Sequence, residues 1–142
     1  MNENELSSFT IGQAMKIHTT LGAGLLESVY KECLFYELQK SGLFVEKEKP
    51  YPLIYEEIKL ECGFRADLVV ENKIILEIKC VDSLNDIHKA QLLTYLRLSD
   101  CKLGLLLNFK VLHLRDGIKR VVNNLLRTFA LLCVSLRVTL RY

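Results

Sequence analysis

Hydrophobic residues are most concentrated between positions 64 and 81, where two apolar runs flank a short polar break at 71–73. Apolar runs joined by such a break are typical of a β-hairpin. The second run is apolar at nearly every position, which indicates a strand buried on both faces. Glu77 and Lys79 interrupt it two positions apart, so both side chains point to one face. Because an unpaired buried charge is costly, we expect this acid and this base to serve a purpose.

The length of the turn decides whether Asp67 joins this pair. With a three-residue turn, Val70 lies opposite Ile74 and Asp67 lies opposite Glu77, where Cβ atoms of facing residues are roughly 5 Å apart. A two-residue turn would place Asp67 on the other face of the hairpin. The three-residue register therefore predicts two carboxylates and an amine in one patch.

Such a patch has a chemical and a structural interpretation. Two neighbouring carboxylates suit Mg²⁺ (or Mn²⁺), which binds through one or two carboxylates and keeps several waters. A lysine beside them can hold an attacking water or offset charge on a phosphate. A structural ion-pair cluster would use the same residues, so the hairpin alone does not decide between the two.

The rest of the pattern predicts alternating helices and strands in one domain, since 142 residues with 50% apolar content can bury a core. Helices are expected from residue 7 or 8 to about 20, and over 25–40 and 86–98; strands are expected at 43–47, 51–55, 58–62, 103–108 and 111–114. Strand 103–108 follows a helix, so we expect it to run parallel to its neighbour.

Three motifs occur in a fixed order along the chain. They are Gly24-Leu25-Leu26-Glu27-Ser28-Val29-Tyr30; Asp67, nine residues, Glu77, one residue, Lys79; and Gln91-Leu92-Leu93-Thr94-Tyr95. The first is similar to the signature of small bacterial GxxExxY proteins, and the second resembles the PD-(D/E)XK nuclease superfamily to which they belong. The third is similar to a helical glutamine motif in several of its branches. The resemblance covers about residues 11–123, although Ala66 stands where the superfamily's name has proline.

The resemblance implies an α/β fold of the restriction-endonuclease type, with a central mixed β-sheet flanked by helices. It implies one domain over residues 1–123 and an apolar, basic extension over 124–142. The implied activity is Mg²⁺-dependent hydrolysis of phosphodiester bonds in nucleic acid, either DNA or RNA. The alternative is a non-catalytic module on the same fold that binds nucleic acid or protein.

The resemblance also implies roles for individual residues. Asp67, Glu77 and the backbone carbonyl of Ile78 would hold the metal, and Lys79 would position or activate a water. Glu27 would be a further ligand or would orient a water. Its place in a first helical turn and its spacing from Lys31 are the simpler local explanation.

The glutamine motif and the aromatic residues complete the implied site. Gln91, which we expect to face inward, would lie near the lysine and contact phosphate or water. Tyr30 and Tyr95 are expected to pack first and to contact substrate at the edge of the site. His88 is a weaker candidate for a phosphate contact, with helix capping as its alternative role.

Composition adds expectations about location and assembly. Five scattered cysteines without a C-x-x-C pair argue against a zinc site or a disulfide framework and favour the cytoplasm. The N-terminus does not have the pattern of a signal peptide, and no apolar run is long enough to span a bilayer, so no membrane contact is expected. Residues 1–108 carry a net charge of −4 and residues 109–142 carry +6, so the basic end could attract phosphate. We expect the tail to form a helix up to about Cys133 and then a strand, packed on the body or in a homodimer.

Overall fold

The computed structural model describes residues 1–123, in which a five-stranded mixed sheet carries helices on both faces. The elements are α1 (Glu3–Leu21), α2 (Glu27–Lys40), β1 (Val45–Tyr55), β2 (Ile58–Val70), β3 (Ile74–Lys79), α3 (Asp86–Ser99), β4 (Leu103–Asn108), the 3₁₀ helix η1 (Leu114–Gly117) and β5 (Ile118–Val122). The strands lie in sequence order, and only β3 and β4 are parallel. The predicted α/β fold and the parallel strand 103–108 are confirmed.

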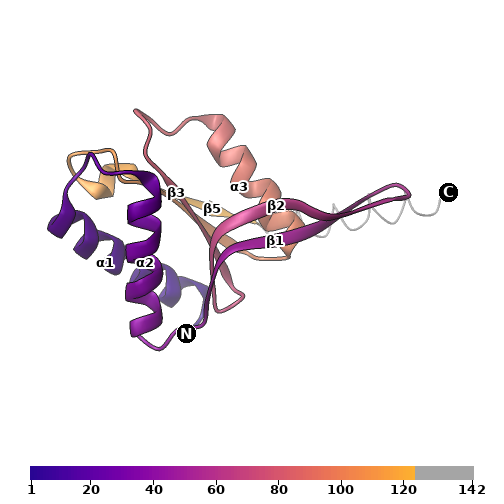
Figure 1. Cartoon of the computed structure of the whole chain (residues 1–142), viewed down its shortest axis with the longest axis horizontal. Helices are drawn as coiled ribbons and strands as arrows, with labels where there is room; N and C mark the ends of the chain where they lie inside the picture. The colour runs from indigo at the N-terminus through magenta and orange to yellow at the C-terminus, as the bar shows by residue number, and fades with distance from the viewer. Residues whose placement is uncertain (124–142) are drawn as a thin grey trace.

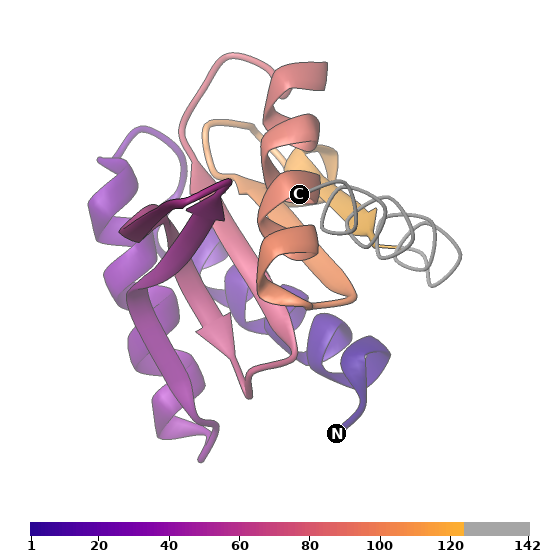
Figure 2. The ribbon, with the colours of Figure 1, turned by 90° about the vertical axis from the view of Figure 1, so that its right-hand side faces the viewer.

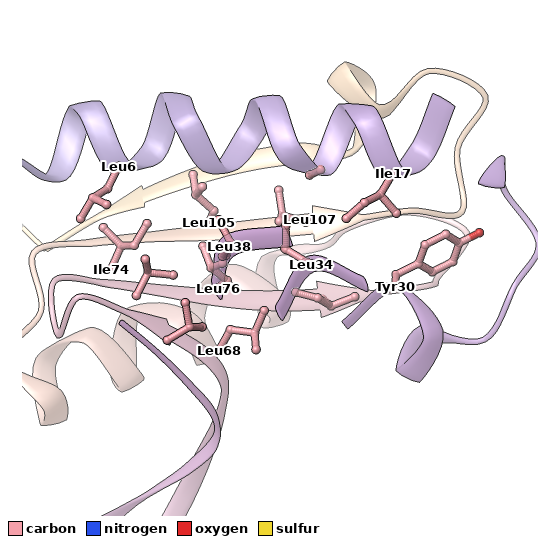
Figure 3. Close-up of a cluster of buried hydrophobic side chains, with 14 of the residues drawn as sticks. Leu6, Ile17, Tyr30, Leu34, Leu38, Leu68, Ile74, Leu76, Leu105 and Leu107 are labelled. Carbon is pink, nitrogen blue, oxygen red and sulfur yellow. The ribbon is translucent and has the colours of Figure 1, made fainter. Parts of the chain in front are cut away.

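The sheet separates two hydrophobic cores. Helices α1 and α2 cover one face and α3 covers the other (Figure 2). Figure 3 shows the larger core, in which leucines and isoleucines of α1 and α2 meet those of the central strands; its labelled members are Leu6, Ile17, Tyr30, Leu34, Leu38, Leu68, Ile74, Leu76, Leu105 and Leu107. Because β3 and β4 are covered on both faces, they are apolar almost throughout, as the sequence pattern indicated.

The central hairpin has the three-residue register. Val70 pairs with Ile74 and Leu68 pairs with Leu76, with residues 71–73 in the turn. Glu71 and Asn72 adopt φ values of 53° and 52°, and asparagine tolerates this left-handed region better than most residues. The register that sets Asp67 against Glu77 is therefore confirmed.

The strands β2 and β3 separate just beyond this pairing. Regular pairing between them ends at Leu68 and Leu76, whereas β3 continues beside β4 as far as Lys79 and Asn108. Strand β2 meanwhile stays paired with β1. The candidate carboxylates lie where regular pairing between β2 and β3 ends.

The four short strands predicted before and within the hairpin are two long ones. Strand β1 runs from within the predicted strand 43–47 to the end of the predicted strand 51–55, and β2 joins 58–62 to the first strand of the hairpin. Pro50 and Pro52 are tolerated in β1 because, within residues 1–123, it is an edge strand that pairs only with β2, and its register shifts between Tyr51 and Leu53. The far half of this ribbon projects from the body (Figure 1), and Tyr55 and Ile58 at its tip are 64% and 57% exposed.

Two local predictions are wrong. Helix α1 begins at Glu3 rather than at residue 7 or 8, because the Asn2 side chain accepts the Glu5 amide proton and caps it. Residues 111–114 are not a strand, and the last strand is 118–122. There the Val111 carbonyl bonds to His18 Nε2 at 2.9 Å, so it does not take part in a sheet ladder.

No helix within residues 1–123 has the length and apolar character needed to cross a membrane. The expectations for the tail, including its helix, its strand and a homodimer formed through it, concern residues 124–142 and lie outside the described residues.

Candidate active site

Asp67 and Glu77 connect β2 and β3 through side-chain hydrogen bonds at the point where regular pairing between these strands ends. The Asp67 amide donates to Glu77 Oε1 at 3.2 Å, and the Ile78 amide donates to Asp67 Oδ2 at 2.9 Å. The two side chains thus replace the backbone bonds that a continuous ladder would have made. A strand residue directs its amide and carbonyl toward the same neighbouring strand. The Ile78 carbonyl therefore faces the β2 side of β3, and its role as a third oxygen donor stays a prediction.

Glu77 is the more shielded of the two acids. It is 4% exposed, whereas the Asp67 side chain is 23% exposed. Burial raises the pKa of Glu77 to about 8, and the negative charge of Asp67 adds to the increase. Two carboxylates in this setting are unfavourable without a compensating cation, which is a property of metal-binding acids.

Lys79 lies two residues beyond Glu77 on the same face of β3. Its backbone is held between β4 and the following loop, since the Phe109 amide donates to the Lys79 carbonyl at 3.0 Å. Its charge lowers the pKa of Glu77 against the larger upward effects. Within residues 1–123 the ammonium forms no ion pair shorter than 4.0 Å. The structural alternative, a salt bridge from Lys79 to either acid, is therefore not what the structure shows.

The lysine closest to Asp67 is one that sequence reasoning did not assign to the site. Lys31 Nζ, on α2, lies 3.9 Å from Asp67 Oδ1 and 2.9 Å from Glu48 Oε1. Burial acts to lower the pKa of Lys31, but the bond to Glu48 and the surrounding negative charges raise it overall. The sequence offered only Glu27 as a partner for this lysine, because contacts with β1 and β2 are distant along the chain.

Glu27 begins α2 and lies exposed near the end of β3. Its negative charge helps burial to raise the pKa of the Cys80 thiol, and it also acts on Lys31. The expected pair with Lys31 does not form within 4.0 Å in the part of the chain that is described. Glu27 is thus close enough for its charge to act on Cys80 and Lys31, and its side chain is exposed to solvent.

Tyr30 is a core residue that shapes the loop before α2. Its ring is fully buried and stacks on Phe109 with 4.4 Å between centroids. Its hydroxyl donates to the Gly22 carbonyl at 2.6 Å and accepts from the Leu25 amide at 3.1 Å. These contacts fix the start of the helix that carries Glu27, so the observed role of Tyr30 is to position the loop.

Helix α3 packs on the face of the sheet opposite α1 and α2, and it carries the candidate residues Gln91 and Tyr95. Tyr95 stacks on Phe64 with 4.2 Å between centroids. Burial and the charge of Glu77 raise its pKa, while an interaction with Gln91 has the opposite effect. Gln91 is exposed, so the expectation that it faces inward is wrong. It instead lies on the exposed side of α3, one turn from Tyr95, with which its side chain interacts.

His88 is occupied as a helix cap. Its Nδ1 accepts the Asn85 amide proton at 3.2 Å, and the Asn85 side chain accepts the His88 amide proton at 3.2 Å. This reciprocal pair is a capping box at the start of α3. The other ring nitrogen is not engaged by these bonds.

Asn108 is a further residue that sequence reasoning missed. It is 1% exposed and lies opposite Lys79 in the β3–β4 register. Its side chain donates to the Val81 carbonyl at 2.9 Å and accepts from the Val81 and Lys110 amides. It therefore fixes the chain as it leaves β3. A polar residue at the end of the apolar run 103–107 was the available signal.

The donor set fits a hard divalent cation. Asp67 and Glu77 bring carboxylate oxygens together at one place, and Mg²⁺ takes few protein ligands and several waters. No cluster of three or more His, Cys, Asp or Glu side chains placed to hold a metal occurs within residues 1–123. Two hollows of about 740 and 350 Å³ lie elsewhere, beside and between α1 and α2.

Comparison with known proteins gives one match. A family model described as the PD-(D/E)XK nuclease superfamily matches residues 4–121. No curated protein and no solved structure matches the chain. The matched range includes every element from α1 to β5 and all the candidate residues named above.

Proposed function

Because the chain belongs to the PD-(D/E)XK nuclease superfamily, we propose that it hydrolyses phosphodiester bonds of nucleic acid with a divalent cation, Mg²⁺ or Mn²⁺. Asp67, Glu77 and the carbonyl of Ile78 would hold the cation. The finer assignment to GxxExxY proteins rests on the motif from Gly24 to Tyr30. A cytoplasmic location and a nuclease domain that ends near residue 123 are part of the same proposal.

One observation carries the proposal: a buried carboxylate with an elevated pKa interlocks with a second carboxylate, and a lysine beside them has no ion pair among the described residues. In a structural cluster we would expect Lys79 to pair with one of the acids, since omitting a partner for a buried charge is strongly destabilising. Asp67 has Lys31 at 3.9 Å, but Lys79 has no such partner among the described residues. Here Glu77 is 4% exposed and its pKa is raised to about 8. This arrangement is poised for a cation and a substrate from outside the chain.

Each residue then has a defined task. When bound, the cation would supply Lewis acidity toward the phosphate. Lys79 would hold the attacking water and offset charge on the phosphate oxygens. Glu27, from the start of α2, would order water at the edge of the site. Gln91 and Tyr95 would contact the substrate from α3.

The test is cleavage by the full-length protein of a mixed panel of single- and double-stranded DNA and RNA. We expect products with Mg²⁺ or Mn²⁺ and none with EDTA, because the carboxylates are then left without a cation. Gel analysis of labelled ends would show which bonds break. Binding of the panel that persists in EDTA, without cleavage under any metal condition, would instead favour the non-catalytic module.

A further inference from the structure

Lys31 occupies a position that the proposed mechanism does not use. Its ammonium is shared between two carboxylates, at 2.9 Å from Glu48 Oε1 and 3.9 Å from Asp67 Oδ1. The Lys31 side chain is 15% exposed and that of Glu48 is 58% exposed. One partner therefore belongs to the candidate site and the other faces solvent.

We propose that Lys31 is a counter-ion built into the metal site. Its ammonium offsets the charge of Asp67 when no divalent cation is bound, and it moves wholly to Glu48 when one binds. The inference rests on the proposed function, because it takes Asp67 as a metal ligand. On this proposal a residue of α2 lowers the affinity of the site for the cation, and that residue is not one of the motif residues.

Repulsion between the two positive charges would favour such a movement. A cation bound to Asp67 would place a second positive charge on a carboxylate that already has an ammonium 3.9 Å away. Like charges a few ångströms apart repel appreciably even at the effective dielectric of a protein surface. The separation is also shorter than the Debye length of about 8 Å at physiological salt, so ions in solution do not remove the repulsion.

Glu48 provides the alternative position. It already contacts the ammonium at 2.9 Å, and it stands on the exposed side of the edge strand β1. A lysine side chain has four flexible carbons, so rotations alone can carry its head away from Asp67. Neither α2 nor the sheet has to shift.

Two substitutions should then act in opposite directions. Lys31→Met removes the competing ammonium, and we expect cation affinity to rise roughly tenfold. Glu48→Gln removes the alternative partner, so the ammonium stays with Asp67 and affinity should fall several-fold. If Lys31 merely joined α2 to β1, losing either partner would loosen the same contact, and the two changes would act in the same direction.

The experiment is a Mn²⁺ titration of the full chain, with free Mn²⁺ measured by electron paramagnetic resonance. Lys47→Met is the matched control for the lost positive charge, since Lys47 joins β1 to Glu32 of α2 at 2.7 Å. Glu46→Gln is the control for the lost negative charge, since Glu46 pairs with Lys49 at 2.8 Å. Lys31→Gln repeats the first change with a polar head, in case the methionine variant folds poorly.

The outcomes distinguish failure of the counter-ion inference from failure of the proposed metal site. Tighter binding in Lys31→Met and Lys31→Gln, weaker binding in Glu48→Gln and small changes in the controls would support the counter-ion. Unchanged or weaker binding in both Lys31 variants would overturn it, while wild-type binding that is lost in Asp67→Asn would leave the metal site standing. Absence of Mn²⁺ binding in every protein would overturn the metal site and the counter-ion together.

Discussion

Replacement of Lys79 by alanine should lower the rate of metal-dependent cleavage by about 100- to 1000-fold, the effect typical of losing one group that stabilises transition-state charge. The ammonium lies on the same face of β3 as Glu77 and has no ion-pair partner closer than 4.0 Å within residues 1–123. Its charge is therefore available to the phosphate and the attacking water. Divalent-cation binding should not weaken, because Lys79 is not a ligand.

Single-turnover cleavage rates and a Mn²⁺ titration measure the two effects separately. Lys119→Ala is the matched control, since Lys119 is an exposed strand lysine in β5, two strands away from β3. It should cleave at close to the wild-type rate. A Lys79→Ala rate within threefold of wild type would show that this amine does not act in the reaction.

Replacement of Glu77 by glutamine should stabilise the metal-free protein at pH 8 by about 2–4 kcal/mol, because one pKa unit corresponds to about 1.4 kcal/mol. The pKa of Glu77 is about 8 in the folded chain, raised first by burial and then by the charge of Asp67. In the unfolded chain the carboxyl ionises near its ordinary value of 4.5. Glutamine keeps the oxygen that accepts the Asp67 amide proton and removes the charge.

The same shift fixes the direction of the pH dependence. Between about pH 4.5 and pH 8 the folded protein keeps a proton that the unfolded chain has lost, so this group lowers the free energy of unfolding as pH rises. Above pH 8 both states are ionised and the penalty is constant. Urea unfolding in EDTA at pH 5, 6.5 and 8 should show the two proteins diverging with pH.

Divalent cations should reverse the comparison. Saturating Mg²⁺ should stabilise wild type at pH 8, because a ligand that binds only the folded state raises its stability, and should stabilise Glu77→Gln much less. Glu57→Gln, at the exposed tip of the β1–β2 ribbon, is the control and should follow wild type throughout. If the free energy of unfolding depended on pH in the same way for wild type and Glu77→Gln, the pKa of Glu77 would not be raised in the folded protein.

The centre of the fold was accessible from the sequence because it depends on local patterns. The polar break at 71–73 predicted the hairpin, and period-two alternation placed Asp67 against Glu77 for a three-residue turn, which is the turn that the structure has. The sequence analysis divided β1 into two short strands because charged residues and prolines around Pro50 are unusual within a strand. They are tolerated there because β1 is an edge strand whose outer side faces solvent. Residues 111–114 resemble a strand, but the bond from His18 to Val111 depends on the packing of α1.

The parts of the site that the sequence did not reveal depend on contacts between distant segments. Lys31 meets Glu48 and Asp67 only once α2 has packed beside the sheet. Asn108 gains its role because β4 runs beside β3. Gln91 was expected to face inward from its apolar neighbours, yet α3 buries Leu92 and Leu96 and leaves Gln91 exposed.

The most direct measurement is anomalous diffraction from a crystal of the full chain soaked in Mn²⁺. A single peak touching carboxylate oxygens of both Asp67 and Glu77, at about 2.2 Å from each, is the result we predict, and Asp67→Asn should remove it. A map without a peak there, in which Lys31 still faces Asp67 in a crystal that binds Mn²⁺ elsewhere, would contradict the claim that these two acids share a metal ion.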